Sequence, residues 1–245
     1  KNQGTVHDVT NQLGMLSSIS KEAIRIDDED EALEKLIYAC KIALTPPKGP
    51  VSIEIPIDIQ RKKIKRPALL DTISLPHISG ELGDTKSLDK IENYIKSSKR
   101  KIIWVGNGAK FATEEVNLFI KMGFAVVTST QGRGVVSETN KMCLGAFNAV
   151  PLIEEFYKTL DLMLVVGSRL RGHETRDMSL ELPKKLVQID IDPSAKNRTY
   201  KTNQFHCGDA KKVLAELAKR LAGKISVDNE WLDEVSDLKN QIYLD

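Results

Sequence analysis

The 245-residue sequence is poor in cysteine and has no long apolar run, and each shortage excludes a class of protein. Its three cysteines, Cys40, Cys143 and Cys207, are far apart and lack CxxC spacing, which excludes a disulfide framework and a cysteine zinc site. No apolar run approaches the roughly 20 residues of a membrane helix, and the N-terminus lacks a signal-peptide core. We therefore expect a cytoplasmic protein with no membrane partner.

The sequence also lacks an excess of charge of either sign. Its 36 Lys and Arg residues against 34 Asp and Glu residues give a net charge of +2, which is too balanced to indicate a nucleic-acid partner. Two basic clusters, at 61–66 and 99–101, are interpreted as solvated surface. Hydrophobic residues make up 41% of the chain, which leaves enough apolar material for a folded core.

Recognisable catalytic motifs are missing as well. The four histidines, His7, His77, His173 and His206, lie in separate segments without metal-ligand spacing. There is no GxSxG, no HExxH and no phosphate loop. These motifs and spacings therefore identify no catalytic residue and no metal ligand in the sequence.

The first 60 residues contain one helix followed by one strand. Residues 1–20 are polar and show no clear period, whereas apolar residues recur every three or four positions over 32–43, as in a helix. Residues 51–59, "VSIEIPIDI", alternate as a strand that Pro56 places at an edge or leaving the sheet. One helix and one strand cannot enclose a hydrophobic core. Residues 1–60 are therefore predicted to be the C-terminal part of a domain, followed by a basic linker at 61–74.

From residue 75 onward, strands of continuous Ile, Val and Leu alternate with amphipathic helices. Parallel sheets that are buried on both faces need such strands. We predict an α/β fold over 75–222, a doubly wound, Rossmann-like parallel sheet, preceded by the end of another α/β domain. Residues 223–245 are either a terminal helix or the start of a linker to a third domain.

The residues that directly follow each predicted strand are the candidate ligand-binding residues, because open α/β sheets bind ligands at the carboxyl ends of their strands. Gly106 and Gly108 would admit close approach of a ligand, or form only a strand-to-helix turn. Arg169 suits a phosphate or a planar ring, and an exposed surface arginine is the alternative. Asp190 suits ribose hydroxyls.

Seven segments, in order, resemble thiamine diphosphate-dependent enzymes of the acetolactate synthase, pyruvate oxidase and benzoylformate decarboxylase group. They are "GPVSIEIPIDIQ", "IIWVGNGA", "AVVTSTQGRGVVSE", "LGAFN", "LVVGSRLRGHETRD", "LVQIDIDPS" and "HCGDAKKVLAEL". The resemblance implies that 1–60 closes a pyrimidine-binding domain and that 75–222 is a central nucleotide-binding-type domain. It also implies that His7, Asp8 and Gln12 lie near an active site.

The resemblance implies a lyase or transferase that decarboxylates or ligates 2-oxo acids, with thiamine diphosphate and Mg²⁺ as cofactors and a homodimer or homotetramer as the assembly. The family's catalytic glutamate and its GDG motif have no counterpart in the sequence. We therefore expect a fragment of a longer enzyme, inactive alone. The alternatives are a non-catalytic FAD- or ADP-binding module, and an NAD-using enzyme on a related sheet, which does not explain "GPVSIEIPID".

The central domain of the family holds FAD, ADP or nothing. The family's nucleotide contacts carry over to thirteen positions: Gly106, Asn107, Gly108, Ser129, Thr130, Gln131, Gly145, Gly167, Ser168, Arg169, Asp190, Ile191 and Asp209. The chain departs from the family where Asn107 replaces a common glycine and where "SRLRGHETRD" replaces an acidic run.

Overall fold

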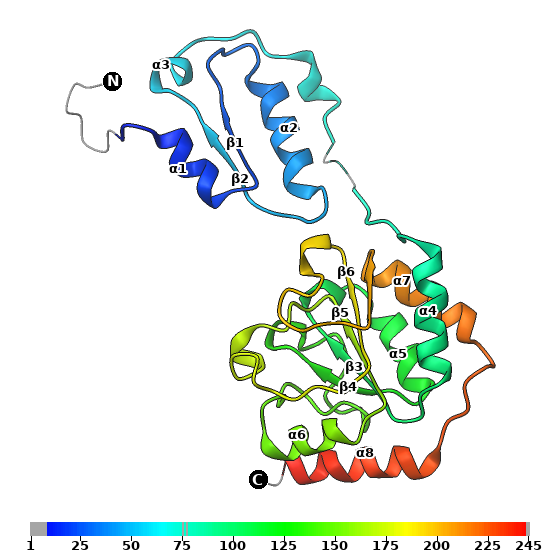
Figure 1. Ribbon diagram of the computed structural model, residues 1–245. Coiled ribbons are helices and arrows are strands. Elements are labelled where there is room, and N and C mark those ends of the chain that lie inside the picture. The colour runs from blue at the N-terminus through cyan, green and yellow to red at the C-terminus, as the bar shows by residue number, and fades with distance from the viewer. Residues whose placement is uncertain (1–8, 75, 77, 244–245) are drawn as a thin grey trace. The chain divides into compact units, whose positions relative to one another are not determined.

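The computed structural model describes residues 9–74, 76 and 78–243 (Figure 1). The chain forms two compact units, residues 1–79 and 80–245, and each is described by itself. Over the described residues, no helix has the length and apolar character needed to cross a membrane.

The first unit is a pair of parallel strands with short helices. Its regular elements are α1 (Gln12–Ile19), β1 (Glu22–Arg25), α2 (Ala32–Leu44), β2 (Val51–Glu54) and α3 (Ile57–Gln60), followed by the 3₁₀ turn η1 (Ala68–Asp71). Strands β1 and β2 pair in register, with Ile24 opposite Ile53. Ile26, Ala39 and Ile59 are its buried apolar residues among those described. The buried core of this unit is therefore small.

The predicted strand over 51–59 is wrong in its second half, because β2 ends at Glu54 and α3 begins at Ile57. Pro56 precedes α3 with φ −58°, and its ring provides no N–H for a sheet. The side chain of Gln60 donates a hydrogen bond to the Ile55 carbonyl at 2.6 Å, which fastens the helical turn. The apolar alternation of 55–59 therefore does not continue the strand.

The region before residue 29 is more regular than its sequence indicates. Helix α1 begins after Asn11, whose side chain accepts a hydrogen bond from the Gly14 amide at 2.9 Å. Strand β1 follows, and Arg25 pairs with Glu54 of β2 at 2.8 Å. Neither element has a strong apolar period, since α1 buries no residue and all four positions of β1 are half-buried.

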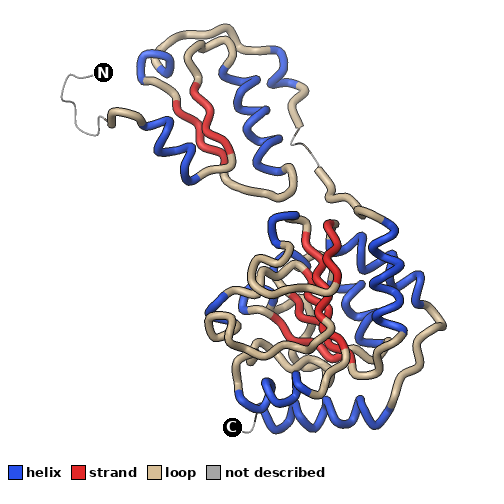
Figure 2. The backbone as a smooth tube through the Cα atoms, in the orientation of Figure 1, coloured by secondary structure: helices blue, strands red, loops and turns tan. Residues whose placement is uncertain are grey.

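The second unit contains a five-stranded parallel sheet, which Figure 2 shows in red. The strands are β3 (Lys101–Val105), β4 (Ala125–Thr128), β5 (Leu162–Val166), β6 (Leu186–Asp190) and β7 (Gln204–Cys207), in the order β4-β3-β5-β6-β7. Residues of β3 to β6 are buried throughout. Ile103 lies opposite Val126 on one side and Leu164 on the other.

Helices cover both faces of this sheet, so the prediction of a doubly wound, Rossmann-like α/β fold is confirmed. Helices α4 (Thr85–Lys96), α5 (Thr113–Lys121) and α7 (Ala210–Leu221) pack on one face against Ile103 and Leu164. Helices α6 (Pro151–Lys158) and α8 (Asn229–Ile242) pack on the other against Trp104 and Val165 (Figure 1). Alternate residues of each strand thus face different cores.

The strand order reverses between β3 and β5. From β3 the chain crosses to β4 at one edge, and it then returns to β5 on the opposite side of β3. The loops after β3 and β5 consequently leave in different directions at the carboxyl end of the sheet. In doubly wound sheets this switch point is where ligands bind.

Candidate functional site

Three predicted glycines join the two loops at the switch point. The Gly106 amide donates to the Val166 carbonyl at 2.8 Å, and the Gly108 amide donates to the Gly167 carbonyl at 2.9 Å. A Cβ atom at Gly106 would lie 2.2 Å from the Gly167 oxygen, and one at Gly108 would lie 2.7 Å from the Gly167 Cα. These glycines are therefore needed for contact between backbones, whether or not a ligand lies above them.

The loop after β4 packs beside this pair. The Ser129 amide donates to the Val105 carbonyl at 2.9 Å, and the Ser129 hydroxyl accepts from the Gly132 amide at 2.9 Å, which forms the 3₁₀ turn η3 (Thr130–Gly132). A Cβ atom at Gly132 would lie 2.1 Å from the Val105 oxygen. Gly132 is not among the thirteen predicted contacts, although it lies on the loop after β4, in the "QGRG" motif.

The predicted residues at the switch point form an exposed rim over a buried floor. Asn107, Gly108, Thr130, Gln131 and Arg169 are exposed, whereas Gly106, Ser129 and Ser168 are buried and Gly167 is half-buried. Segments that are far apart in the chain therefore present five accessible residues at one end of the sheet.

Two buried polar residues that the prediction missed hold the rim in place. Glu174 accepts a hydrogen bond from the Thr130 amide at 2.7 Å, and Gln188 donates its side-chain amide to the Ser168 carbonyl at 3.1 Å. Gln188 stands out in the sequence as a polar residue within an apolar strand. Glu174 gives no such signal, because it lies in a polar loop.

The end of β6 is acidic. Asp190 accepts a hydrogen bond from the Asp192 amide at 2.9 Å, and burial raises the pKa of Asp190. The Ser194 hydroxyl lowers the pKa of Asp192, which also pairs with Arg169 at 3.4 Å. Burial and these two aspartates raise the pKa of Cys207. Arg169 is thus exposed at the rim and also forms an ion pair with Asp192 at the end of β6.

The segment at the start of the second unit crosses the ends of β6 and β7. The Asp209 amide donates to the Glu81 carbonyl at 2.7 Å, and the Asp209 side chain caps α7 as predicted. A Cβ atom at Gly80 would lie 2.6 Å from the Asp209 side chain and 2.9 Å from that of Ile191. Asp209 and Ile191 therefore lie together under residue 80.

Gly145 lies beyond the edge strand β4, in different surroundings. Its carbonyl accepts from the Thr128 amide at 2.9 Å, and a Cβ atom there would lie 3.2 Å from the Phe147 ring and from the Tyr243 hydroxyl. Its φ of +77° favours glycine. The structure gives it no contact with the Gly106–Gly167 pair.

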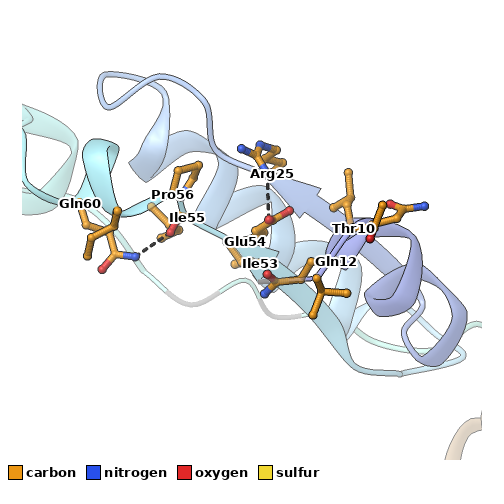
Figure 3. Close-up of a pocket in the computed structure, with 12 residues that line it drawn as sticks. Thr10, Gln12, Arg25, Ile53, Glu54, Ile55, Pro56 and Gln60 are labelled. Atoms are coloured by element: carbon orange, nitrogen blue, oxygen red, sulfur yellow. Dashed lines mark hydrogen bonds and ion pairs between the residues drawn. The ribbon is translucent and has the colours of Figure 1, made fainter. Parts of the chain in front are cut away.

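Gln12 lines a groove of about 980 Å³ in the first unit. In Figure 3, Gln12 lies beside Ile53 and Glu54, and Arg25 reaches Glu54 from the neighbouring strand. The second carboxylate oxygen of Glu54 is buried and has no hydrogen-bond partner among the described residues. His7 and Asp8, which the prediction placed near Gln12, lie outside the described residues.

The described residues do not fit a magnesium–diphosphate site. Over 9–74, 76 and 78–243, no three His, Cys, Asp or Glu side chains gather as metal ligands do. The carboxylates at the sheet end have local roles, since Asp209 caps a helix and Asp192 binds Ser194 and Arg169. No catalytic step through thiamine diphosphate follows from these residues.

The sheet order defines an α/β protein with a doubly wound, Rossmann-like fold, and comparison with known families specifies which one. The family model of the thiamine pyrophosphate enzyme central domain matches residues 88–217. The chain belongs to this family.

Curated relatives share its sequence over most of its length. A probable acetolactate synthase large subunit of Methanococcus aeolicus is 27% identical over 93% of the chain and 41% of the relative. The acetolactate synthase large subunit of Corynebacterium glutamicum is 26% identical over 92% of the chain and 38% of the relative. The chain thus spans about 40% of the length of such relatives. These matches do not support a non-catalytic nucleotide-binding module.

A solved structure shares the fold. The X-ray structure of a candidate thiamin diphosphate-dependent enzyme from Mycobacterium smegmatis matches 86% of the chain and 40% of that protein, with a TM-score of 0.66 and 21% sequence identity. This similarity supports the α/β architecture alone.

Proposed function

We propose that these 245 residues are the central part of a thiamine diphosphate-dependent enzyme that decarboxylates or ligates 2-oxo acids, as acetolactate synthases do. The observation that carries the proposal is the family match over 88–217, together with acetolactate synthase relatives along more than nine-tenths of the chain. The proposed substrate is a small 2-oxo acid. The cofactor would supply the electron sink for the carbon–carbon chemistry, as it does wherever it is bound.

In this proposal the chain itself provides scaffold and binding surfaces. The first unit would be the C-terminal part of a pyrimidine-binding domain. Two parallel strands are too few for an independent sheet, and the groove beside Gln12 and Glu54 offers a surface that further strands of such a domain would cover. The central domain would be residues 75–222, and α8 would be a terminal helix that packs on its sheet.

Magnesium, the assembly and the location complete the proposal. Mg²⁺ would join thiamine diphosphate to residues outside the described set, because the described residues do not form a site for it. We propose a homodimer or homotetramer in the cytoplasm. Sedimentation of the whole protein tests the assembly, and a monomer at all concentrations would contradict it.

The rim at the switch point is the proposed site of an adenine nucleotide, either FAD or ADP. The exposed Arg169 and the buried Asp190 at the strand ends support it, because a cation and a carboxylate suit phosphate and ribose. Of the thirteen predicted residues, Gly145 has the least support, since it lies beyond β4. The others lie at the carboxyl ends of β3 to β7, with Asp190 as the last residue of β6 and the rest on the loops that follow the strands.

Release of carbon dioxide tests the proposed activity. The natural polypeptide that contains these residues is purified from its source and supplied with a panel of 2-oxo acids, with thiamine diphosphate and Mg²⁺ present or omitted. We expect release from at least one 2-oxo acid, only when thiamine diphosphate is present. Release that is independent of the cofactor would contradict the proposal. A flavin absorbance band in the same preparation would show that the protein binds a flavin, which favours FAD over ADP as the proposed ligand of the rim.

A further inference from the structure

A second cavity, of about 660 Å³, lies in the second unit at the amino end of the sheet, opposite the end that carries the candidate nucleotide site. It is lined by the end of α4, the first residue of β3, the end of α5 and the segment before α8. Its charged residues are four lysines and two acids: Lys96, Lys99, Lys101, Lys224, Asp228 and Glu230. The amino end of a parallel sheet is not where the candidate nucleotide site lies, so this cavity is separate from it.

Lys101 is a buried cation that donates hydrogen bonds to two neutral backbone carbonyls. It is 4% exposed, and its ammonium group donates to the Ser98 carbonyl at 3.0 Å and the Lys99 carbonyl at 3.2 Å. The Phe124 ring lies 5.6 Å from the nitrogen. Among the described residues Lys101 forms no ion pair. Burial lowers its pKa, and the charge of Asp161 offsets only part of that effect.

Two of the other lysines of the cavity are paired with a carboxylate. Lys96 and Lys224 both pair with Glu92, Lys224 at 3.5 Å. Asp228 caps α8 by accepting a hydrogen bond from the Glu230 amide at 3.0 Å. Lys99 has no ion-pair partner among the described residues, and its backbone amide is bound by Asp161 at 2.8 Å. Lys99 and Lys101 are therefore the lysines of the cavity that form no ion pair among the described residues.

We propose that this cavity binds a small anion that carries a phosphate group, held by Lys101 with the help of Lys99. Buried charges in proteins are normally paired, and Lys101 forms no ion pair with any carboxylate in the part of the chain that the structure describes. Lysine binds phosphate as a point charge, and the cavity has the size of a small-molecule site. The inference does not depend on the proposed enzymatic function, because neither lysine belongs to the candidate nucleotide site.

The competing explanation is purely structural. In that case Lys101 only fastens the turn after α4 through the carbonyls of Ser98 and Lys99. The two explanations differ in one consequence. If Lys101 has only a structural role, phosphate does not change the stability of the protein. If the cavity binds phosphate, phosphate stabilises the folded protein in a saturable manner that depends on both lysines.

Thermal unfolding of the natural polypeptide that contains these residues tests the proposal directly. Inorganic phosphate, glycerol 3-phosphate and potassium chloride are titrated at matched ionic strength. We expect a saturable rise of Tm with phosphate or with the phosphate ester, and none with chloride. If inorganic phosphate stabilises at lower concentration than glycerol 3-phosphate, the ligand is free phosphate. If glycerol 3-phosphate does so, the ligand is a phosphorylated compound. An equal rise with chloride would overturn the proposal.

Matched variants locate the site. Lys101→Met keeps the apolar stem and removes the charge, and Lys99→Met does the same at the exposed neighbour. We expect each to weaken phosphate binding at least tenfold in isothermal titration, whereas Lys201→Met, an exposed lysine that does not line the cavity, leaves it unchanged. Unchanged affinity in Lys99→Met and in folded Lys101→Met would overturn the proposal.

Lysine NMR provides a readout that does not require a folded Lys101→Met protein. With the lysine side chains labelled, the titration of Lys101 is followed in the wild-type chain with and without saturating phosphate. A neighbouring anion favours the charged ammonium, so we expect the pKa of Lys101 to rise in phosphate. An unchanged titration would overturn the proposal even if Tm rises.

Discussion

Gly108 and Gly167 are joined by a 2.9 Å hydrogen bond from the amide of the first to the carbonyl of the second, at the point where the strand order reverses. The two backbones are so close that a Cβ atom at Gly167 would lie 2.6 Å from the Gly108 backbone. The loops that form the candidate site therefore depend on two residues without side chains.

Gly167→Ala is expected to destabilise the second unit by roughly 2–3 kcal/mol, because alanine would combine a left-handed backbone with a clash. The φ of Gly167 is +59°. Urea unfolding followed by tryptophan fluorescence measures the change, since both tryptophans, Trp104 and Trp231, belong to the second unit. Gly134→Ala is the control, with φ +86° and no atom within 4 Å of the added carbon. It should cost about 1 kcal/mol, and equal losses would contradict the close-approach argument.

Arg169→Ala is expected to weaken adenine-nucleotide binding at least tenfold, or about 1.4 kcal/mol, if the rim holds the nucleotide as proposed. Isothermal titration with ADP and with FAD measures the affinity. Arg171→Ala, which removes an exposed arginine two residues away, is the matched control. Wild-type affinity in Arg169→Ala would remove Arg169 from the site.

His206 is expected to make the stability of the second unit fall with acidity. Its Nε2 lies 2.6 Å from the Leu82 carbonyl, to which it donates, so Nδ1 accepts from the Ser87 hydroxyl. Burial lowers the pKa of His206. The unfolded chain therefore takes up a proton first, and the unfolding free energy falls as pH drops below about 6.5 and levels off below the folded pKa.

His206→Gln removes this titration. Replacing the buried imidazole should cost about 1–3 kcal/mol at pH 7.5, and the difference from wild type should shrink as the pH falls to 5. Urea unfolding at several pH values measures both. A difference that stays constant with pH would show that His206 does not titrate between the folded and unfolded states.

Trp231→Ala is expected to destabilise the second unit by roughly 3–5 kcal/mol, since Trp231 fastens α8 to the sheet. Its indole donates to the Gly123 carbonyl at 2.8 Å, and its ring stacks on Phe156 with centroids 5.6 Å apart. Trp231→Phe keeps a ring and should lose only about 1 kcal/mol. Trp104 fluorescence during urea unfolding reports both variants. Similar small losses for both would mean that α8 contributes little.

The sheet of the second unit was predictable because its strands are buried on both faces. Continuous runs such as "KIIWV" and "LMLVV" have few alternative structures, and each is followed by glycine. The first unit was harder, since β1 and β2 are half-buried and α1 has no buried face. Periodicity could not find β1, and it extended β2 beyond Pro56.

The candidate site was predictable only as a set of strand ends. Because parallel strands end at one edge, Gly106, Gly167 and Asp190 could be expected to lie near one another. Sequence could not reveal that the glycines contact each other's backbones, or that Glu174 binds the Thr130 amide from a loop 44 residues away. Such contacts depend on loop conformations that have no periodic signal.

The central claim, that this chain belongs to a thiamine diphosphate-dependent enzyme acting on 2-oxo acids, is tested most directly by cofactor removal and restoration. The natural polypeptide is stripped of metal and cofactor with a chelator and gel filtration, and then given carbon-13 pyruvate. We predict no conversion until thiamine diphosphate and Mg²⁺ are restored, and then acetolactate or acetaldehyde in the carbon-13 NMR spectrum. If pyruvate stays intact after restoration, and other 2-oxo acids supplied in the same way also stay intact, the claim is contradicted.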